Sequence, residues 1–328
     1  MCLSQLLSGL HLQRKFLRSN LTRRGLPVWE VSLLLKKVVS SSAKPAPISV
    51  VIPAYNAESF LEEAIRSVHA QTLPVSEIVV VADACSDKTK EIASTLGARV
   101  FEQHNRNMSA TLNFAIRQTT QPWIALLDAD DYWAADKIAL QWQAIRNFPG
   151  AGLASCDVYT MYPHVTATTS KRELRARWTA VEKVVRKKNC YYTEQVDGGF
   201  LVRVFIATPS AIVRHDVFAE VGLFDESLLY GQTLEFFARV LARFPLVFVQ
   251  QPLVYVRVHD QNHTRGMRGW PSQLSIVDRM LKNPDCYVRG AGKAHREHLK
   301  KQFLQAERTF ARNQGQAERD GTPGEKLH

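Results

Sequence analysis

The chain has 328 residues, of which 45% are hydrophobic and 22% are charged, a balance typical of a soluble globular protein with a sizeable core. The formal charge of +11 lies at the two ends, because residues 1–47 have a net charge of +7 and residues 288–328 of +4. Residues 48–287 hold 25 charged groups of each sign. This neutral centre disfavours a basic groove for nucleic acid through the folded body.

The N-terminal segment combines apolar and basic residues. Residues 3–18 mix them at helical spacing, and residues 31–39 add a second apolar patch that contains Lys36 and Lys37. This pattern fits an amphipathic anchor on an anionic membrane surface, a solvated leader or a helix packed on the body. No run reaches the roughly 20 apolar residues of a transmembrane helix, and no secretory signal is evident. We expect a cytoplasmic protein, with peripheral attachment to the inner membrane face as one alternative.

The five cysteines are scattered along the chain without a Cys-x-x-Cys pair. Their number is odd, which disfavours a framework of disulfides, and their spacing disfavours structural zinc. The cysteine pattern therefore favours a reducing compartment.

Residues 40–47 are rich in Ser and Pro and are expected to form a linker. After this linker, short apolar strands alternate with amphipathic helices, which predicts a parallel sheet of right-handed βαβ units. The expected strands are 48–52, 78–81, 99–102 and 123–127, and the expected helices are 57–71, 87–96, 109–118 and 134–147.

The second half of the chain is less regular. Its expected strands are 153–159, 205–213, 246–249 and 253–258, and its expected helices are 216–221, 234–244 and 291–313. Between the first two of these strands, residues 164–200 are polar and irregular and are interpreted as an insertion or lid.

The most informative motif is Leu127-Asp128-Ala129-Asp130-Asp131, in which an apolar strand ends in three closely spaced carboxylates. Ligands of α/β sheets bind at this carboxyl end of the strands. Crowded carboxylates repel one another unless a hard divalent ion neutralises them, typically an ion that also binds a phosphate. The alternative is that these aspartates cap the helix expected at 134–147, since Asp is a favoured N-cap residue.

Three segments occur in an order and spacing that resemble the family 2 glycosyltransferases. They are Ile48-Ser49-Val50-Val51-Ile52-Pro53-Ala54-Tyr55-Asn56, Val79-Val80-Val81-Ala82-Asp83-Ala84-Cys85-Ser86-Asp87 and the acidic turn. The resemblance covers about residues 46–262 and implies an α/β GT-A fold with a mostly parallel central sheet. It implies a basic extension and linker at 1–47, a catalytic domain at 48–262 and a basic helical extension at 263–328.

The resemblance also implies roles for individual residues. It places Pro53, Ala54 and Tyr55 around the nucleobase and gives Asp83 a hydrogen bond to the base. Asp128 would lie near the ribose, and Asp130 would bind Mn²⁺ or Mg²⁺ on the diphosphate. In the later Arg-x-His motif, His259 would reach the diphosphate or ligate the metal, although a lone histidine is more often structural. The chain departs from the family pattern at Ala82, Ala84 and Leu112, where Asp, Gly and Arg are usual.

The general base of an inverting transfer is missing from its usual place. The family carries Glu-Asp where this chain has Gln232-Thr233, and a threonine cannot act as a base near neutral pH. Glu235, Asp157 and Glu226 are the candidate replacements, although each is also explained as a cap or surface acid. Either the base comes from elsewhere, or the acceptor needs little activation, or the enzyme is impaired.

We therefore expect transfer of a sugar from a nucleoside diphosphate sugar to a hydroxyl acceptor, with inversion. The acceptor would be a glycan, a lipid-linked sugar or a precursor of a cell-surface polysaccharide. A non-catalytic protein that binds nucleotide sugar or glycan is the alternative, because of Thr233. A nucleotidyltransferase is disfavoured, since residues 53–58 lack the Gly-rich, basic loop that holds a triphosphate.

Overall fold

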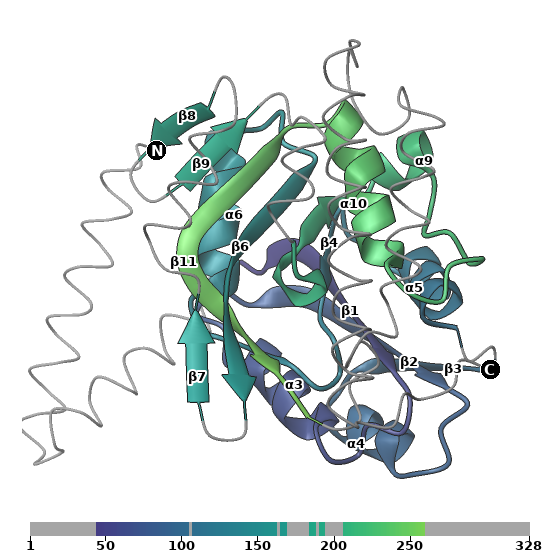
Figure 1. Cartoon of the computed structure of the whole chain (residues 1–328). Helices are drawn as coiled ribbons and strands as arrows, with labels where there is room; N and C mark the ends of the chain where they lie inside the picture. Colours follow the sequence, from purple (N-terminus) through teal and green to yellow (C-terminus); the bar gives the residue numbers. More distant parts are fainter. Residues whose placement is uncertain are drawn as a thin grey trace, which may run out of the picture.

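The structure, a computed structural model, describes residues 44–104, 107–162, 165–168, 184–187, 190–193 and 206–259 (Figure 1). The first half contains β1 (Ala46–Ala54), α3 (Leu61–His69), β2 (Val75–Asp83), α4 (Thr89–Thr95), β3 (Arg99–Gln103), α5 (Met108–Arg117), β4 (Trp123–Leu126), β5 (Tyr132–Trp133) and α6 (Lys137–Asn147). The second half contains β6 (Leu153–Tyr162), β7 (Val165–Thr168), β8 (Val184–Lys187), β9 (Cys190–Thr193), η1 (Thr208–Ser210), β10 (Ile212–Arg214), α9 (Val217–Val221), α10 (Gln232–Arg243) and β11 (Leu246–Arg257).

The described strands form one mixed sheet in the order β3-β2-β1-β4-β10-β6-β11-β9-β8. The first four are parallel, as the βαβ pattern predicts, and β6 and β11 are parallel to each other. β10 runs antiparallel to both β4 and β6 and joins the two parallel groups. β5 and β7 are short antiparallel additions to β11 and β6.

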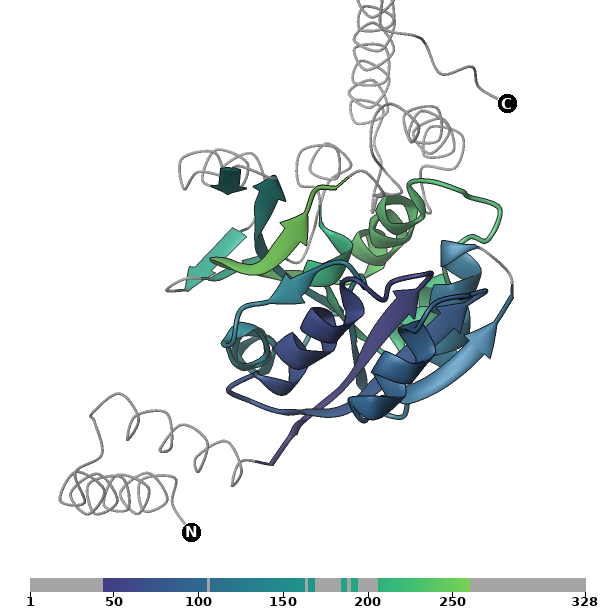
Figure 2. The ribbon, with the colours of Figure 1, turned by 90° about the horizontal axis from the view of Figure 1, so that it is seen from below.

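Helices cover both faces of the sheet (Figures 1 and 2). α3, α4 and α6 pack on one face, and α5, α9 and α10 pack on the other. Each face of the sheet has its own hydrophobic core. In β1, Val50 belongs to the core under α3, α4 and α6, Val51 belongs to the core under α5, α9 and α10, and neither side chain is exposed. Because both faces are buried, the strand reads as a continuous apolar run rather than as an alternating one.

Several boundaries differ from the sequence prediction for local physical reasons. The strand expected at 205–213 begins only at Ile212, because η1, which contains Pro209, occupies the preceding residues. The two strands expected at 246–249 and 253–258 are one strand, β11, whose register shifts around Pro252. Proline lacks the N–H that a regular ladder needs, and a bulge accommodates it. The N-cap of α5 is Asn107 rather than Ser109.

Part of the expected organisation lies outside the described residues: the N-terminal amphipathic segments, the helix at 291–313 and most of the insertion at 164–200. Within that insertion, the described residues form β7, β8 and β9, so it is not entirely irregular. No helix in the described part of the chain combines the length and apolar character needed to cross a bilayer.

Candidate active site at the carboxyl edge of the sheet

The predicted nucleotide-binding residues meet at one edge of the sheet. β2, β1 and β4 are adjacent and parallel, so their carboxyl ends lie side by side. Pro53 and Ala54 end β1, Asp83 ends β2, and Asp128 follows Leu127 just beyond β4. Tyr55 stands beyond β1 with 57% of its surface exposed, as a residue that contacts a ligand would.

The loops after β1 and β2 are joined by polar contacts. Asn56 accepts a hydrogen bond from the Ser86 amide at 2.9 Å, and the Cys85 thiol donates to the Ala54 carbonyl at 3.3 Å. Both loops contain a left-handed residue, with φ of 44° at Asn56 and 51° at Ala84. The conformation of Ala84 explains why glycine is usual there in the family, because only glycine adopts it without strain.

Asp83 is almost fully buried and holds the start of α5. Its Oδ2 accepts hydrogen bonds from the Asn107 amide at 3.2 Å and from the Thr111 hydroxyl at 2.8 Å. The sequence gives no signal for this anchoring role, because nothing local links Asp83 to residues 24 and 28 positions away. Asp87 has a structural role, since its carboxylate accepts from the backbone amides of Thr89 and Glu58.

The acidic turn is not a helix cap. α6 begins at Lys137 with Asp136 as its N-cap residue, and β5 lies between the turn and this helix. Burial and the nearby Asp130 raise the pKa of Asp128 to about 7. Burial and the charges of Asp128 and Asp130 likewise raise the pKa of Asp131 well above its usual range. The turn therefore crowds carboxyl groups whose charged forms are disfavoured alone and would be stabilised by a cation.

The end of β11 brings a histidine and an arginine to this turn. His259 Nε2 lies 3.0 Å from Asp130 Oδ2, and the Phe60 ring stacks on the imidazole with centroids 4.7 Å apart. Arg257 donates its backbone N–H to Asp131 at 2.9 Å and a guanidinium N–H to the Asp130 carbonyl at 2.6 Å. The guanidinium also pairs with Glu63 of α3. The sequence indicated His259, but it gave no signal for the role of Arg257.

The arrangement suits a divalent cation that is shared with a substrate. Asp130 and His259 offer one carboxylate and one imidazole, a donor pair compatible with Mn²⁺. Among the described residues no group of three His, Cys, Asp or Glu side chains is placed to hold a metal. Diphosphate oxygens and water would complete the coordination, which is the usual situation for Mg²⁺ at phosphate sites.

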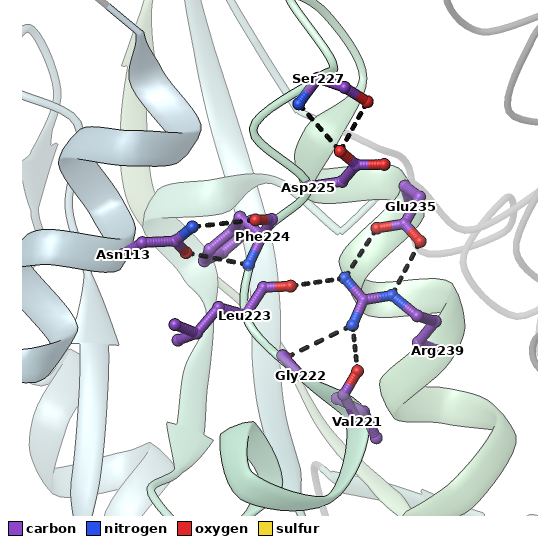
Figure 3. A network of polar contacts seen from close by, with 9 residues as sticks. All are labelled: Asn113, Val221, Gly222, Leu223, Phe224, Asp225, Ser227, Glu235 and Arg239. Atoms are coloured by element: carbon purple, nitrogen blue, oxygen red, sulfur yellow. Dashed lines mark hydrogen bonds and ion pairs between the residues drawn. The ribbon is translucent and has the colours of Figure 1, made fainter. Parts of the chain in front are cut away.

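The candidate bases occupy different surroundings. Glu235 is buried in α10, and both of its carboxylate oxygens accept hydrogen bonds from Arg239 (Figure 3). Asp157 is buried within β6, which extends to Tyr162, and its Oδ1 accepts from the Val158 amide. Glu226 is exposed, and Asn113 donates to its Oε1 at 2.8 Å. Thr233, the second residue of α10, is half-buried.

The fold and the position of the acidic turn define the GT-A class of α/β proteins. Residues 49–222 match the sequence model of Glycosyl transferase family 2, and the chain belongs to this family. An uncharacterized glycosyltransferase of Rickettsia typhi is 28% identical over 221 residues, which cover 66% of this chain and 65% of that protein. The chain thus spans slightly less than two thirds of this relative.

Two solved structures show the same fold. Staphylococcus aureus TarS 1-349 in complex with UDP-GlcNAc has a TM-score of 0.61 and 17% identity, over 82% of this chain and 74% of that one. The mannosyltransferase PcManGT from Pyrobaculum calidifontis, in complex with GDP-Man and Mn²⁺, has a TM-score of 0.55 and 18% identity. That match covers 88% of this chain and 83% of the mannosyltransferase.

Proposed function

We propose that the protein transfers a sugar from a nucleoside diphosphate sugar to a hydroxyl acceptor, with inversion at the anomeric carbon. The observation that carries this proposal is the meeting of Asp130 with His259 at the sheet edge that also holds Asp83. Donor-bound structures of the same fold, with UDP-GlcNAc in TarS and GDP-Man in PcManGT, support the class of donor.

Different residues at this edge of the sheet would bind different parts of the donor. Pro53, Ala54 and Tyr55 would line the nucleobase, and Asp83 would accept a hydrogen bond from it. Asp128 would hold the ribose, and Asp130 and His259 would face the diphosphate. In the reaction an acceptor oxygen attacks the anomeric carbon as the bond to the phosphate oxygen breaks, and the hydroxyl proton passes to a base.

A divalent cation fits this site because the turn crowds carboxylates whose protonated forms are favoured without one. Asp130 and His259 would hold it. When bound, Mn²⁺ or Mg²⁺ would neutralise charge that develops on the leaving diphosphate.

The acceptor is proposed to be a glycan, a lipid-linked sugar or a precursor of a surface polysaccharide. Transfer would take place in the cytoplasm, with the basic N-terminal segment able to bind the inner membrane face by attraction to anionic lipids. These assignments rest on the family and on the composition of residues 1–47.

Thermal unfolding with UDP-, GDP- and dTDP-sugars, each with and without Mn²⁺, tests the donor class. A ligand that binds only the native state raises the unfolding temperature by mass action. We expect one donor to stabilise the protein in a cation-dependent way, and Asp130→Ala to abolish this effect. Asp136→Ala, which removes an exposed carboxylate from the same segment, is the matched control and should keep it.

Release of nucleoside diphosphate from the stabilising donor then tests turnover. Stabilisation that is unchanged in Asp130→Ala would contradict the cation site. Binding without release, across a panel of hydroxyl acceptors, would favour the non-catalytic alternative.

A further inference from the structure

Glu235 and Arg239, four residues apart on α10, form a bidentate ion pair. Arg239 Nε lies 2.7 Å from Glu235 Oε1, and Arg239 Nη2 lies 2.8 Å from Oε2. The exposed fractions of the two side chains are 4% for Glu235 and 16% for Arg239. Both carboxylate oxygens are therefore held by one guanidinium in a largely dry environment, where such paired hydrogen bonds are strong.

The same guanidinium holds the segment that follows α9. Arg239 Nη2 donates to the Leu223 carbonyl at 2.8 Å, and Nη1 donates to the carbonyls of Val221 and Gly222 (Figure 3). α9 ends at Val221, so these carbonyls have no continuing helix to bond with. One arginine thus joins α10 to residues 221–223.

The opposite side of this segment is fixed to α5. The Asn113 side chain donates to the Phe224 carbonyl and accepts from the Phe224 amide, each at 2.9 Å. Asn113 also donates to Glu226 Oε1, and the Asn107 side chain donates to the Glu226 carbonyl at 2.9 Å. Residues 221–226, which we call the bridging segment, are therefore held by α10 on one side and by α5 on the other (Figure 3).

The bridging segment leads to the donor site. The Asn107 amide, at the start of α5, donates to Asp83 Oδ2 at 3.2 Å. A continuous chain of hydrogen bonds and backbone runs from Glu235 through Arg239, the bridging segment and Asn107 to Asp83. This chain of contacts connects the start of α10 to the end of β2. The start of α10 is where the family carries its base and where this chain carries Thr233.

We propose that Glu235 is a positioning residue and not the general base: it orients Arg239, which sets the bridging segment and the start of α10 against the donor site. This inference rests on the proposed function. A general base must lie within hydrogen-bond reach of the hydroxyl that it deprotonates. Glu235 is buried, and both of its oxygens are bound to a guanidinium that is itself occupied by three backbone carbonyls.

The two roles make different predictions for a paired substitution. For a positioning pair, Glu235→Gln and Arg239→Met should each lower the turnover number, because each loosens the link between α10 and the bridging segment. The double variant should turn over about as fast as Arg239→Met, and it should recover part of the unfolding temperature because no unpaired buried charge is left. If Glu235 were the base, Glu235→Gln and the double variant would turn over far more slowly than Arg239→Met, which keeps the carboxylate.

The experiment uses the full chain with Mn²⁺ and the donor identified by thermal shift, and it measures release of nucleoside diphosphate against pH. We expect turnover to fall about tenfold in each single variant and to lie within about threefold of Arg239→Met in the double variant, since members of one network break the same link and their effects are not additive. The acidic limb of the pH profile should be unchanged in every variant that turns over. Glu62→Gln with Arg66→Met, an exposed pair of the same spacing on α3, is the matched control and should be silent.

Turnover in Glu235→Gln and in the double variant far below that of Arg239→Met would overturn the proposal, as would loss of the acidic limb in the double variant. Amide hydrogen exchange at Phe224 gives a second readout that needs no donor. Exchange should be faster than in wild type in both single variants and in the double variant; equal exchange in all four proteins would also overturn the proposal. If wild type releases no nucleotide from any donor, the proposed function fails, and the exchange cycle still decides the role of the pair.

Discussion

His259 and Asp130 are 129 residues apart in the chain, yet His259 Nε2 lies 3.0 Å from Asp130 Oδ2. The short pairing of β5 with β11, which joins Tyr132 to Tyr255, brings the end of β11 to the acidic turn. Phe60, just before α3, stacks on the imidazole and limits its rotation. The two proposed metal ligands are thus held by three separate parts of the fold.

His259→Ala should weaken the cation-dependent binding of nucleoside diphosphate while leaving cation-independent binding in place. The imidazole would contribute one ligand, and the nucleobase contacts proposed for Tyr55 and Asp83 do not involve it. The change in Mn²⁺ affinity is measured by titrating Mn²⁺ into the protein with nucleoside diphosphate while the signal of free Mn²⁺ is monitored. His104→Ala, an exposed histidine near the end of β3, is the control. Equal Mn²⁺ affinity in His259→Ala and wild type would contradict the assignment.

Arg257→Lys should weaken Mn²⁺ binding although the charge is retained. Arg257 uses separate nitrogens for the Asp130 carbonyl and for Glu63, and its Cζ lies over the Tyr132 ring, 4.7 Å from the centroid. A lysine cannot reproduce this fork and stack. Partners that orient metal ligands typically contribute about 10–100-fold in affinity, and we expect a loss in that range. Arg66→Lys on the exposed face of α3 provides the comparison. A loss of Mn²⁺ affinity below about twofold would fall outside that range and would show that Arg257 contributes to stability alone.

The first half of the fold was predictable because its signals are local. Apolar runs such as Ile48–Ile52 and the helices between them are read from short stretches, and the parallel order follows from their alternation. The acidic turn was found in the same way. Its alternative as a helix cap was wrong because the helix begins at Lys137, after an intervening strand that is only two residues long.

Long-range pairings were beyond local reasoning. The bond from Arg257 to Asp131 spans 126 residues, and the bonds from Asn113 to Phe224 span 111. Nothing in the local sequence of Glu235 distinguishes a base from a partner of Arg239, since either role places a carboxylate in the first turn of α10. The buried environment that decides between them is created by packing against α9 and α5.

Glu77→Gln should destabilise the protein at neutral pH and much less in acid. Burial would raise the pKa of Glu77, but hydrogen bonds from Ser49, from the amide and hydroxyl of Thr120, and from Arg99 lower it overall. A depressed carboxyl pKa stabilises the fold above the unfolded-state pKa, and this contribution is lost as the pH falls through the folded-state value. We expect a loss of about 1–3 kcal/mol near neutrality, as for hydrogen bonds to charged groups.

Urea unfolding of Glu77→Gln and wild type at a series of pH values, from neutrality down to the most acidic pH at which both proteins fold, measures this change, since the gap narrows steadily below the unfolded-state pKa. Glu62→Gln, which changes an exposed glutamate on α3, should show a small and nearly constant difference. A gap for Glu77→Gln that is the same across the whole series would show that geometry, and not charge, accounts for its effect.

Lys137→Met should stabilise the protein at neutral pH. Lys137 is fully buried, its Nζ has no hydrogen-bond partner within the described part of the chain, and it lies 4.0 Å from the Trp133 ring centroid. Burial lowers its pKa to about 8, with the nearby Cys156 acting in the opposite direction. The contact with the indole face offsets only part of the cost of burying a charge. Methionine has a similar length and no charge, so the unfolding temperature should rise by several degrees, given the usual few degrees per kcal/mol.

The pH dependence separates this explanation from a simple packing effect. Between about pH 8 and pH 10.5 the unfolded chain keeps the Lys137 proton and the folded protein releases it, so wild-type stability rises with pH through this window. Lys137→Met cannot show this rise, and its advantage should shrink steadily across the same range. Lys90→Met, at an exposed lysine of α4, should leave the pH profile unchanged. A constant difference between Lys137→Met and wild type from neutral to alkaline pH would contradict the buried charge as the cause.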